Sequence, residues 1–253
     1  MEKRHTKEIR WLLEEKYEGK LTPEAEEDIR KLEDGVPVDY LIGFVDFLGC
    51  RIDLSLLPFI PRPETEYWAE KAIEEIKKQK KPKVLDLFSG SGCVGLAVLK
   101  HCPDAFVDFA EREERALAQI QKNAELNHAD AKRFRVLPSD VFSGIHEKYD
   151  FILANPPYIP EKRKHQVEEQ VVDWEPWEAL FGGPDGLDII RRFLSEAPNY
   201  LKKGGVLYME FDLSEKRAIE RILKEFGHLA WELRKDQYGK WRFLRAALQN
   251  GLR

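Results

Sequence analysis

From Thr65 onward, segments with the helical spacing of apolar residues alternate with short strand patterns. The seven strand patterns occupy residues 83–88, 105–110, 134–137, 149–154, 206–211, 229–233 and 241–246. Gly204-Gly205 is expected to separate the helix over residues 187–201 from the fifth strand. Such alternation is typical of a mostly parallel sheet that helices cover on both faces. We therefore expect an α/β fold with a doubly wound, Rossmann-like sheet of seven strands.

The first part of the chain has a different pattern. Residues 5–34 predict two short amphipathic helices, because their apolar residues recur every three or four positions. Residues 44–60 alternate between apolar and polar side chains, which is typical of a β-hairpin. We expect three parts: a small helical N-terminal domain over residues 1–43, a linking β-hairpin over residues 44–62, and the α/β domain over residues 63–253.

Composition excludes several classes of protein. Of the 253 residues 43% are hydrophobic, enough for a globular core, and the net charge of -5 argues against a dedicated DNA-binding protein. No apolar run approaches the roughly 18 residues that cross a bilayer and no signal for secretion is visible, so we expect a cytoplasmic protein that does not bind membranes. The 3 cysteines form no paired motif and the 6 histidines have no metal-ligand spacing, so we expect no metal.

A glycine-rich turn follows the first strand, in the sequence Val84-Leu85-Asp86-Leu87-Phe88-Ser89-Gly90-Ser91-Gly92. Gly90 and Gly92 allow the backbone to approach a ligand closely, and the next helix begins with free N–H groups. A Rossmann dehydrogenase binds pyrophosphate at such a turn, but Asp86 would lie too close to that anion. Asp86 could instead bind the ammonium group of S-adenosylmethionine (AdoMet) through a water or a backbone amide. A tight turn without a ligand is the alternative.

Polar side chains also follow the second and third strands. Glu111 comes about twenty residues after the glycines, where doubly wound folds place a carboxylate on the ribose hydroxyls. Asp108 is the alternative by position, and simple solvation of a strand end could explain either acid. Ser139-Asp140-Val141 offers a side-chain acceptor and backbone groups suited to an adenine amino group. Because ligands in open α/β sheets bind beyond the carboxyl ends of the strands, these loops predict one common site.

The most specific signal is Asn155-Pro156-Pro157-Tyr158, which ends the fourth strand. Proline has no N–H to donate and cannot continue a central strand, so the carbonyls here are free to face a substrate. The Asn155 side-chain oxygen and the Pro156 carbonyl can accept both hydrogens of a planar NH2 group, while the Tyr158 ring packs on its face. This geometry draws the nitrogen lone pair out of conjugation and aims it at a sulfonium methyl group. The alternative is a plain proline turn.

From about Pro37 onward the chain resembles the peptide chain release factor glutamine methyltransferases (the PrmC/HemK family). The resemblance rests on residues 38–43, 60–66, 86–93, 155–159, 175–180 and 182–187. It implies an AdoMet-dependent methyltransferase domain that methylates the side-chain amide nitrogen of the glutamine in the Gly-Gly-Gln motif of class I release factors. S-adenosylhomocysteine would be the other product. Glutamine methylation of a ribosomal protein and adenine methylation of nucleic acid are the alternatives, although no basic region for stable nucleic-acid binding is visible. A silent AdoMet-binding partner is a further alternative.

The resemblance also implies the site residues. The residues expected to contact AdoMet, with Asp86 added from its position in the turn, are Asp86, Phe88, Ser89, Gly90, Ser91, Gly92, Glu111, Asp140, Val141 and Asn155. The substrate glutamine is expected to contact Asn155, Pro156, Pro157 and Tyr158, of which Asn155, Pro156 and Tyr158 are the catalytic candidates.

The sequence departs from the family pattern in two places. The family usually has glycine at the position of Phe88, and its N-terminal helical domain is usually larger, which leaves the docking of the release factor open. The charged residues 161–166 lack apolar spacing, so we expect a mobile loop there that orders when the protein substrate docks. A permanently solvated loop is the alternative.

Overall fold

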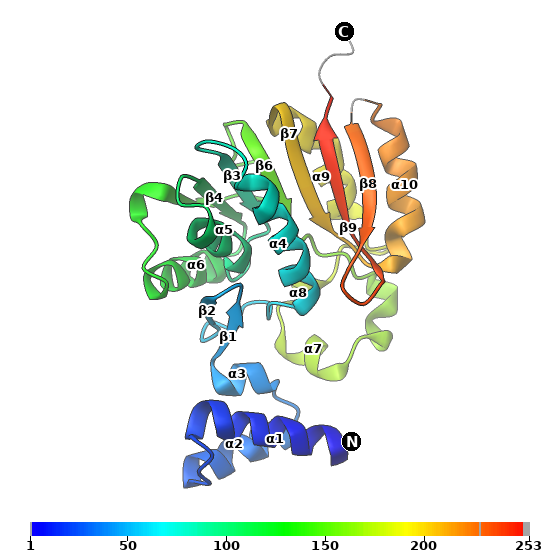
Figure 1. Ribbon diagram of the computed structural model, residues 1–253. Coiled ribbons are helices and arrows are strands. Elements are labelled where there is room, and N and C mark those ends of the chain that lie inside the picture. The colour runs from blue at the N-terminus through cyan, green and yellow to red at the C-terminus, as the bar shows by residue number, and fades with distance from the viewer. Residues whose placement is uncertain (1, 228, 250–253) are drawn as a thin grey trace.

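The computed structural model describes residues 2–227 and 229–249, and a seven-stranded sheet forms its centre (Figure 1). The strands are β3 (Lys83–Leu87), β4 (Phe106–Glu111), β5 (Phe134–Pro138), β6 (Tyr149–Ala154), β7 (Leu201–Glu210), β8 (Leu229–Lys235) and β9 (Trp241–Leu248). Their order is β5-β4-β3-β6-β7-β9-β8, parallel from β5 to β7 and antiparallel where β9 pairs with β7 and β8. The predicted seven-stranded α/β fold is confirmed.

Helices cover both faces of this sheet. One face carries α4 (Pro63–Ile76), α5 (Cys93–His101) and α6 (Glu114–Leu126), and the other carries α9 (Asp188–Tyr200) and α10 (Lys216–Glu225). Successive residues of a strand point to opposite faces, so Phe151 of β6 packs in the first layer and Ile152 in the second. Burial on both faces explains why β6 is almost continuously apolar, with four successive buried residues from Phe151 to Ala154.

The N-terminal helices are α1 (Glu2–Tyr17), α2 (Pro23–Glu33) and α3 (Val38–Ile42), the last of which was not predicted. They enclose a small core of their own that includes Leu12, Leu32 and Leu41. The Thr22 hydroxyl caps α2 by accepting a hydrogen bond from the Ala25 N–H at 3.2 Å. Within the described part of the chain, no helix is both long enough and apolar enough to cross a membrane.

A short hairpin connects these helices to the sheet domain. Its strands are β1 (Phe44–Phe47) and β2 (Cys50–Asp53), and the residues from 54 to 62 are irregular, so strand structure covers only part of the expected hairpin. Amide side chains of α6 hold this connection: Asn123 accepts from the Asp53 N–H at 2.8 Å and Gln119 from the Leu56 N–H at 2.9 Å. The irregular segment is thereby held beside the carboxyl ends of β3 and β4.

One local expectation is wrong. Gly204 and Gly205 lie inside β7, because the chain stays paired with β6 and forms an irregularity between the pairs Tyr149–Leu201 and Phe151–Val206. Gly204 has a φ of 74°, which glycine adopts without strain. Residues 161–166 contain a 3-10 helix, η2 (Glu161–Gln166), and the ordering of this segment when the protein substrate docks stays a prediction. The remaining short helices are η1 (Ala131–Arg133), α7 (Glu169–Trp174), α8 (Trp177–Leu180) and η3 (Leu213–Glu215).

Candidate active site

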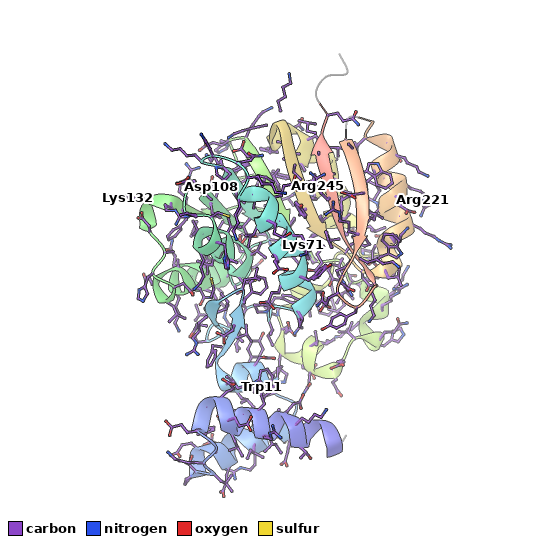
Figure 2. All side chains as sticks on the ribbon, viewed as in Figure 1. Trp11, Lys71, Asp108, Lys132, Arg221 and Arg245 are labelled. Carbon is purple, nitrogen blue, oxygen red and sulfur yellow. The ribbon has the colours of Figure 1, made fainter. Side chains whose placement is uncertain are left out.

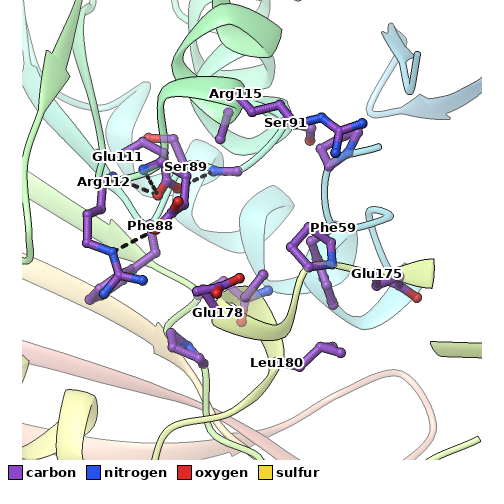
Figure 3. Close-up of a pocket in the computed structure, with 18 of the residues that line it drawn as sticks. Phe59, Phe88, Ser89, Ser91, Glu111, Arg112, Arg115, Glu175, Glu178 and Leu180 are labelled. Atoms are coloured by element: carbon purple, nitrogen blue, oxygen red, sulfur yellow. Dashed lines mark hydrogen bonds and ion pairs between the residues drawn. The ribbon is translucent and has the colours of Figure 1, made fainter. Parts of the chain in front are cut away.

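A cavity of about 530 Å³ opens beyond the carboxyl ends of β3, β4, β5 and β6 (Figure 3). Ligands of doubly wound folds bind at this edge of the sheet. The main lining segments are residues 56–59, 88–91, 110–113, 139–141, 157–159 and 174–181, joined by Pro61, Thr65, Asp86, Cys93, Val94, Arg115, Ala116, Asn155 and Ile189. The loops that the sequence predicts to share one site therefore do meet around one cavity.

The turn after β3 has a tightly folded backbone. Phe88, Gly90 and Gly92 all have positive φ, at 60°, 52° and 80°. Gly90 faces open space, since a Cβ atom there would have no atom within 4 Å. Gly92 is not among the cavity-lining residues, and a Cβ atom there would lie 3.3 Å from Ile120. The glycine at 92 thus serves the turn and its packing on α6, and its contact with AdoMet stays a prediction.

Asp86 is buried at the base of the cavity. Its Oδ2 atom accepts a hydrogen bond from the Gly95 N–H at 2.8 Å, which ties the first turn of α5 to the end of β3. A side chain at Gly95 would collide with this oxygen and with the ring of Phe109. Burial raises the pKa of Asp86 to about 8. A cation bound beside Asp86 would favour its ionised form, and the role of Asp86 toward an ammonium group stays a prediction.

Glu111 projects from the end of β4 toward the glycine turn (Figure 3). Its Oε2 atom accepts from the Gly90 N–H at 2.9 Å, and its Oε1 atom accepts from the Arg112 N–H at 2.7 Å. The alternative acid, Asp108, lies on β4 (Figure 2). It is fully buried and is not among the cavity-lining residues. It accepts hydrogen bonds from Arg135 Nε at 2.7 Å and from the Tyr149 hydroxyl at 2.8 Å. Of the two acids, only Glu111 reaches the cavity.

The loop after β5 forms the next wall. Ser139, Asp140 and Val141 all line the cavity, and the Ser139 hydroxyl fixes the loop by donating to the Val141 carbonyl at 2.7 Å. The Asp140 carboxylate forms an exposed ion pair with Arg192 of α9 at 3.0 Å. This pair holds the Asp140 side chain toward α9.

The Asn-Pro-Pro-Tyr segment leaves β6 at the cavity. Asn155, Pro157 and Tyr158 line it, whereas Pro156 is buried and is not among the lining residues. Asn155 Nδ2 donates to Thr65 Oγ1 at 3.4 Å, and the Tyr158 hydroxyl donates to Glu210 Oε1 at 3.2 Å. Burial, reinforced by the negative charge of Glu210, raises the pKa of Tyr158 well above its ordinary value. Tyr158 therefore stays a neutral hydrogen-bond donor.

Two segments that sequence reasoning left without a role cross the mouth of the cavity. They are residues 56–61 and residues 174–181, and buried Glu175 joins them. Its Oε2 atom accepts from the Ile60 N–H at 3.2 Å, and its Oε1 atom forms an ion pair with Arg62. Trp174 and Trp177 add partly exposed indole rings to this rim.

Sequence reasoning also missed Thr65 and Glu210. Thr65 lies in the first turn of α4, and Glu210 is a fully buried acid at the end of β7. A single acid in the otherwise apolar run Val206–Phe211 was the available signal, because a charged residue is rarely buried without a partner.

Comparisons with a family model and with curated proteins all match this chain to methyltransferases. The family model described as the methyltransferase small domain matches residues 69–174. A release factor glutamine methyltransferase of Deinococcus radiodurans is 33% identical, over 85% of this chain and 76% of that protein. One of Streptococcus pneumoniae is 36% identical, over 82% of this chain and 74% of that protein.

Solved structures share the fold. A ribosomal protein methylase from Lactobacillus delbrueckii superposes with a TM-score of 0.58 at 19% identity, over 79% of this chain and 84% of that one. A 16S ribosomal RNA methyltransferase from Thermus thermophilus, solved with AdoMet and guanosine, gives a TM-score of 0.57 at 20% identity, over 82% of this chain and 50% of that one. The sheet domain is therefore shared by methyltransferases that act on different substrates.

Proposed function

Because this chain belongs to the release factor glutamine methyltransferase family, we propose that it methylates the glutamine of the Gly-Gly-Gln motif in class I release factors. The methyl donor is AdoMet. The observation that carries the proposal is one cavity that holds the glycine turn and Glu111 beside Asn155 and Tyr158. A release factor acts on the ribosome, so we expect the enzyme in the cytoplasm.

The residues of the cavity fit AdoMet. A volume of about 530 Å³ lies within the range usual for small-molecule sites. Open space at Gly90 admits the ligand close to the backbone, and the Glu111 carboxylate can accept hydrogen bonds from a ribose diol. Asp86 lies at the base of the cavity, where its buried carboxylate could pair with the ammonium group. When bound, AdoMet supplies a methyl group on a positively charged sulfur.

The Asn-Pro-Pro-Tyr segment is proposed to hold the substrate amide. Asn155 Oδ1 and the Pro156 carbonyl would accept the two N–H groups, and Tyr158 would pack on the amide plane with Pro157 beside it. The amide nitrogen forms the new bond to the methyl carbon, the electron pair of the broken C–S bond stays on sulfur, and one amide proton leaves to water. Orientation and hydrogen-bond acceptors, rather than a strong base, would lower the barrier.

We propose that the chain divides as its sequence predicts, with the chemistry in residues 63–253. Residues 1–43 and the linking segment 44–62 would then present the release factor to the cavity. The separate core of the N-terminal helices and the place of residues 56–61 at the cavity mouth support this division. Residues 1, 228 and 250–253 of these spans lie outside the described residues.

A labelling experiment tests the function. The purified protein is incubated with methyl-labelled AdoMet and, in separate reactions, a class I release factor, the same factor with its Gly-Gly-Gln glutamine replaced by alanine, ribosomal proteins, and DNA. We expect label only in the intact release factor. Label in the alanine variant would refute the proposed target, and label in a ribosomal protein or DNA alone would favour one of the two other substrates.

A further inference from the structure

A chain of hydrogen bonds connects Asn155 to buried parts of α4 and β7. Asn155 Nδ2 donates to Thr65 Oγ1 at 3.4 Å, and the Thr65 hydroxyl donates to Glu210 Oε2 at 2.6 Å. Thr65 and Glu210 are both buried, and Thr65 and Asn155 both line the cavity. These three residues are far apart in the sequence, and only the folded structure brings them together.

The Glu210 carboxylate accepts hydrogen bonds from three side chains. Its Oε2 atom accepts from the Thr65 hydroxyl and from Trp68 Nε1 at 2.7 Å, while its Oε1 atom faces the Tyr158 hydroxyl at 3.2 Å. Oε2 is the acceptor in both of its bonds, since the Thr65 hydroxyl and the Trp68 N–H each donate to it. The single hydrogen of the Thr65 hydroxyl is thereby directed at Glu210.

The direction of that hydrogen decides which end of the Asn155 amide can face Thr65. With its hydrogen used, Thr65 Oγ1 offers only lone pairs to its other neighbour. The Asn155 NH2 group can donate to a lone pair, whereas Asn155 Oδ1 in its place would oppose one acceptor to another. The amide therefore has one favoured orientation, with Nδ2 on Thr65 and Oδ1 on the opposite side of the amide group.

We propose that Thr65 and Glu210 are positioning residues that keep Asn155 Oδ1 available to accept an N–H of the substrate amide. This inference rests on the proposed function of Asn155. In the reversed orientation, Asn155 would present its own NH2 group to the substrate NH2 group, and neither could accept. This network would thus disfavour the unproductive orientation before the substrate arrives.

Paired substitutions separate positioning from general support of the fold. Thr65→Val keeps the side-chain shape and removes the hydroxyl, and Thr65→Ser keeps the hydroxyl. Trp68→Phe is the matched control, because it removes another hydrogen bond to the same Glu210 oxygen without touching Asn155. Each variant is compared with the wild type by single-turnover methylation of a release factor at saturating AdoMet and substrate, and by its melting temperature.

We expect Thr65→Val to lower the single-turnover rate about tenfold, as for the loss of one hydrogen bond, with AdoMet affinity unchanged. Thr65→Ser should restore most of the rate. Trp68→Phe should lower the melting temperature at least as much but leave the rate near that of the wild type. A wild-type rate in Thr65→Val, or rates that follow melting temperature in both variants, would overturn the inference.

A second measurement does not depend on turnover. The Asn155 side-chain amide is observed by NMR in protein labelled with 15N-asparagine and is assigned by its loss in Asn155→Asp. We expect its exchange with water to accelerate in Thr65→Val and to stay unchanged in Trp68→Phe. If the wild type fails to label a release factor, the proposed function is wrong, yet this exchange rate still decides whether Thr65 orients Asn155. Equal exchange in all three proteins would refute the orientation.

Discussion

Phe88 occupies a backbone conformation that residues with a side chain rarely adopt. Its φ of 60° lies in the left-handed region, which glycine adopts without strain and which costs a residue with a Cβ atom free energy. The ring compensates by packing edge-on against Phe193 of α9, with centroids 6.2 Å apart. The aromatic contact thus offsets part of the backbone strain.

Two substitutions at Phe88 should differ in stability in the opposite order from the usual one, in which alanine is more stable than glycine. Phe88→Ala keeps the strain and loses the packing, whereas Phe88→Gly loses the packing but relieves the strain. We expect the glycine variant to be the more stable by about 0.5–1 kcal/mol in urea unfolding, after allowing for the flexibility of unfolded glycine. At the exposed helical position Ala118 the order should be normal, with Ala118→Gly less stable than the wild type by about 1 kcal/mol. An alanine variant at 88 as stable as the glycine variant would show that no strain is stored there.

Glu111 is the proposed ligand of the ribose diol. Loss of a charge-assisted hydrogen bond costs about 1.5–3 kcal/mol, so Glu111→Ala should weaken AdoMet binding about tenfold or more in isothermal titration calorimetry. Glu114→Ala is the control, since it removes the same charge three residues away at a position that does not line the cavity. Equal affinities for both variants would remove Glu111 from the cofactor site.

Asn155 should matter for methyl transfer more than for folding. Asn155→Ala removes the proposed acceptor, and a transition-state hydrogen bond of this kind is worth about 3 kcal/mol, or roughly a hundredfold in rate. Single-turnover methylation measures the rate, while calorimetry and thermal unfolding check that AdoMet affinity and stability are retained. Near-normal turnover in the alanine variant would contradict the proposed role. Asn155→Asp keeps an acceptor, so it should retain more activity than alanine.

At the scale of elements, the junction of η3 and α10 contains a carboxyl group that is poorly solvated. Glu215 is buried, and its Oε2 atom has no hydrogen-bond partner among the described residues. Burial raises the pKa of Glu215 from its ordinary value of 4.5 to about 7. The folded state therefore holds this proton more tightly than the unfolded state does.

This raised pKa predicts a pH dependence of stability. Between pH 4.5 and pH 7 unfolding releases the proton, so the contribution of Glu215 to stability falls as pH rises and levels off above pH 7. The variant Glu215→Gln carries an amide at this position, which does not titrate. From pH 5 to pH 8, wild type should therefore lose roughly 2–3 kcal/mol relative to Glu215→Gln in urea unfolding. A difference between the two proteins that does not change with pH would exclude the raised pKa.

The same scale shows how far sequence patterns predict structure. The parallel strands were predicted within one or two residues at most ends, because strands buried on both faces are continuously apolar. The predicted start of β7 was wrong, because the pair Gly204-Gly205 fits a turn as well as it fits an irregularity within a strand. The five-residue helix α3 is too short to show a helical period.

The candidate site was predictable only in part. The loops after β3, β4 and β6 could be brought together from sequence, because parallel strands place their carboxyl ends on one edge. The contact between Thr65 and Glu210 could not be predicted, because residues 145 positions apart leave no local sequence pattern that marks a hydrogen bond between them. The same applies to Glu175, whose partner Ile60 lies 115 positions away.

At the scale of the whole molecule, the cavity depends on segments from distant parts of the chain. We expect AdoMet to slow amide hydrogen exchange in residues 56–61 and 174–181 as well as in the glycine turn, because openings that break the cavity release the ligand. At a hundred times Kd, such amides should exchange up to about a hundredfold more slowly. Amides of α1 and α2, which pack in a separate core, serve as the internal reference. Slowing confined to the glycine turn would mean that the two rim segments open independently of the ligand.

The hydrogen bond between Thr65 and Glu210 also has a consequence for biosynthesis. When the ribosome has translated the chain through Tyr158, the glycine turn, Glu111 and the Asn-Pro-Pro-Tyr segment have all been made. The Thr65 hydroxyl still lacks its acceptor, because Glu210 is added more than fifty residues after Asn155. Domains fold as their residues emerge, and here the proposed orientation of Asn155 is completed only by β7, the fifth of the seven sheet strands in chain order. On the proposed role of Thr65 and Glu210, the nascent chain would thus carry its Asn-Pro-Pro-Tyr segment without an oriented Asn155 amide until β7 has been made.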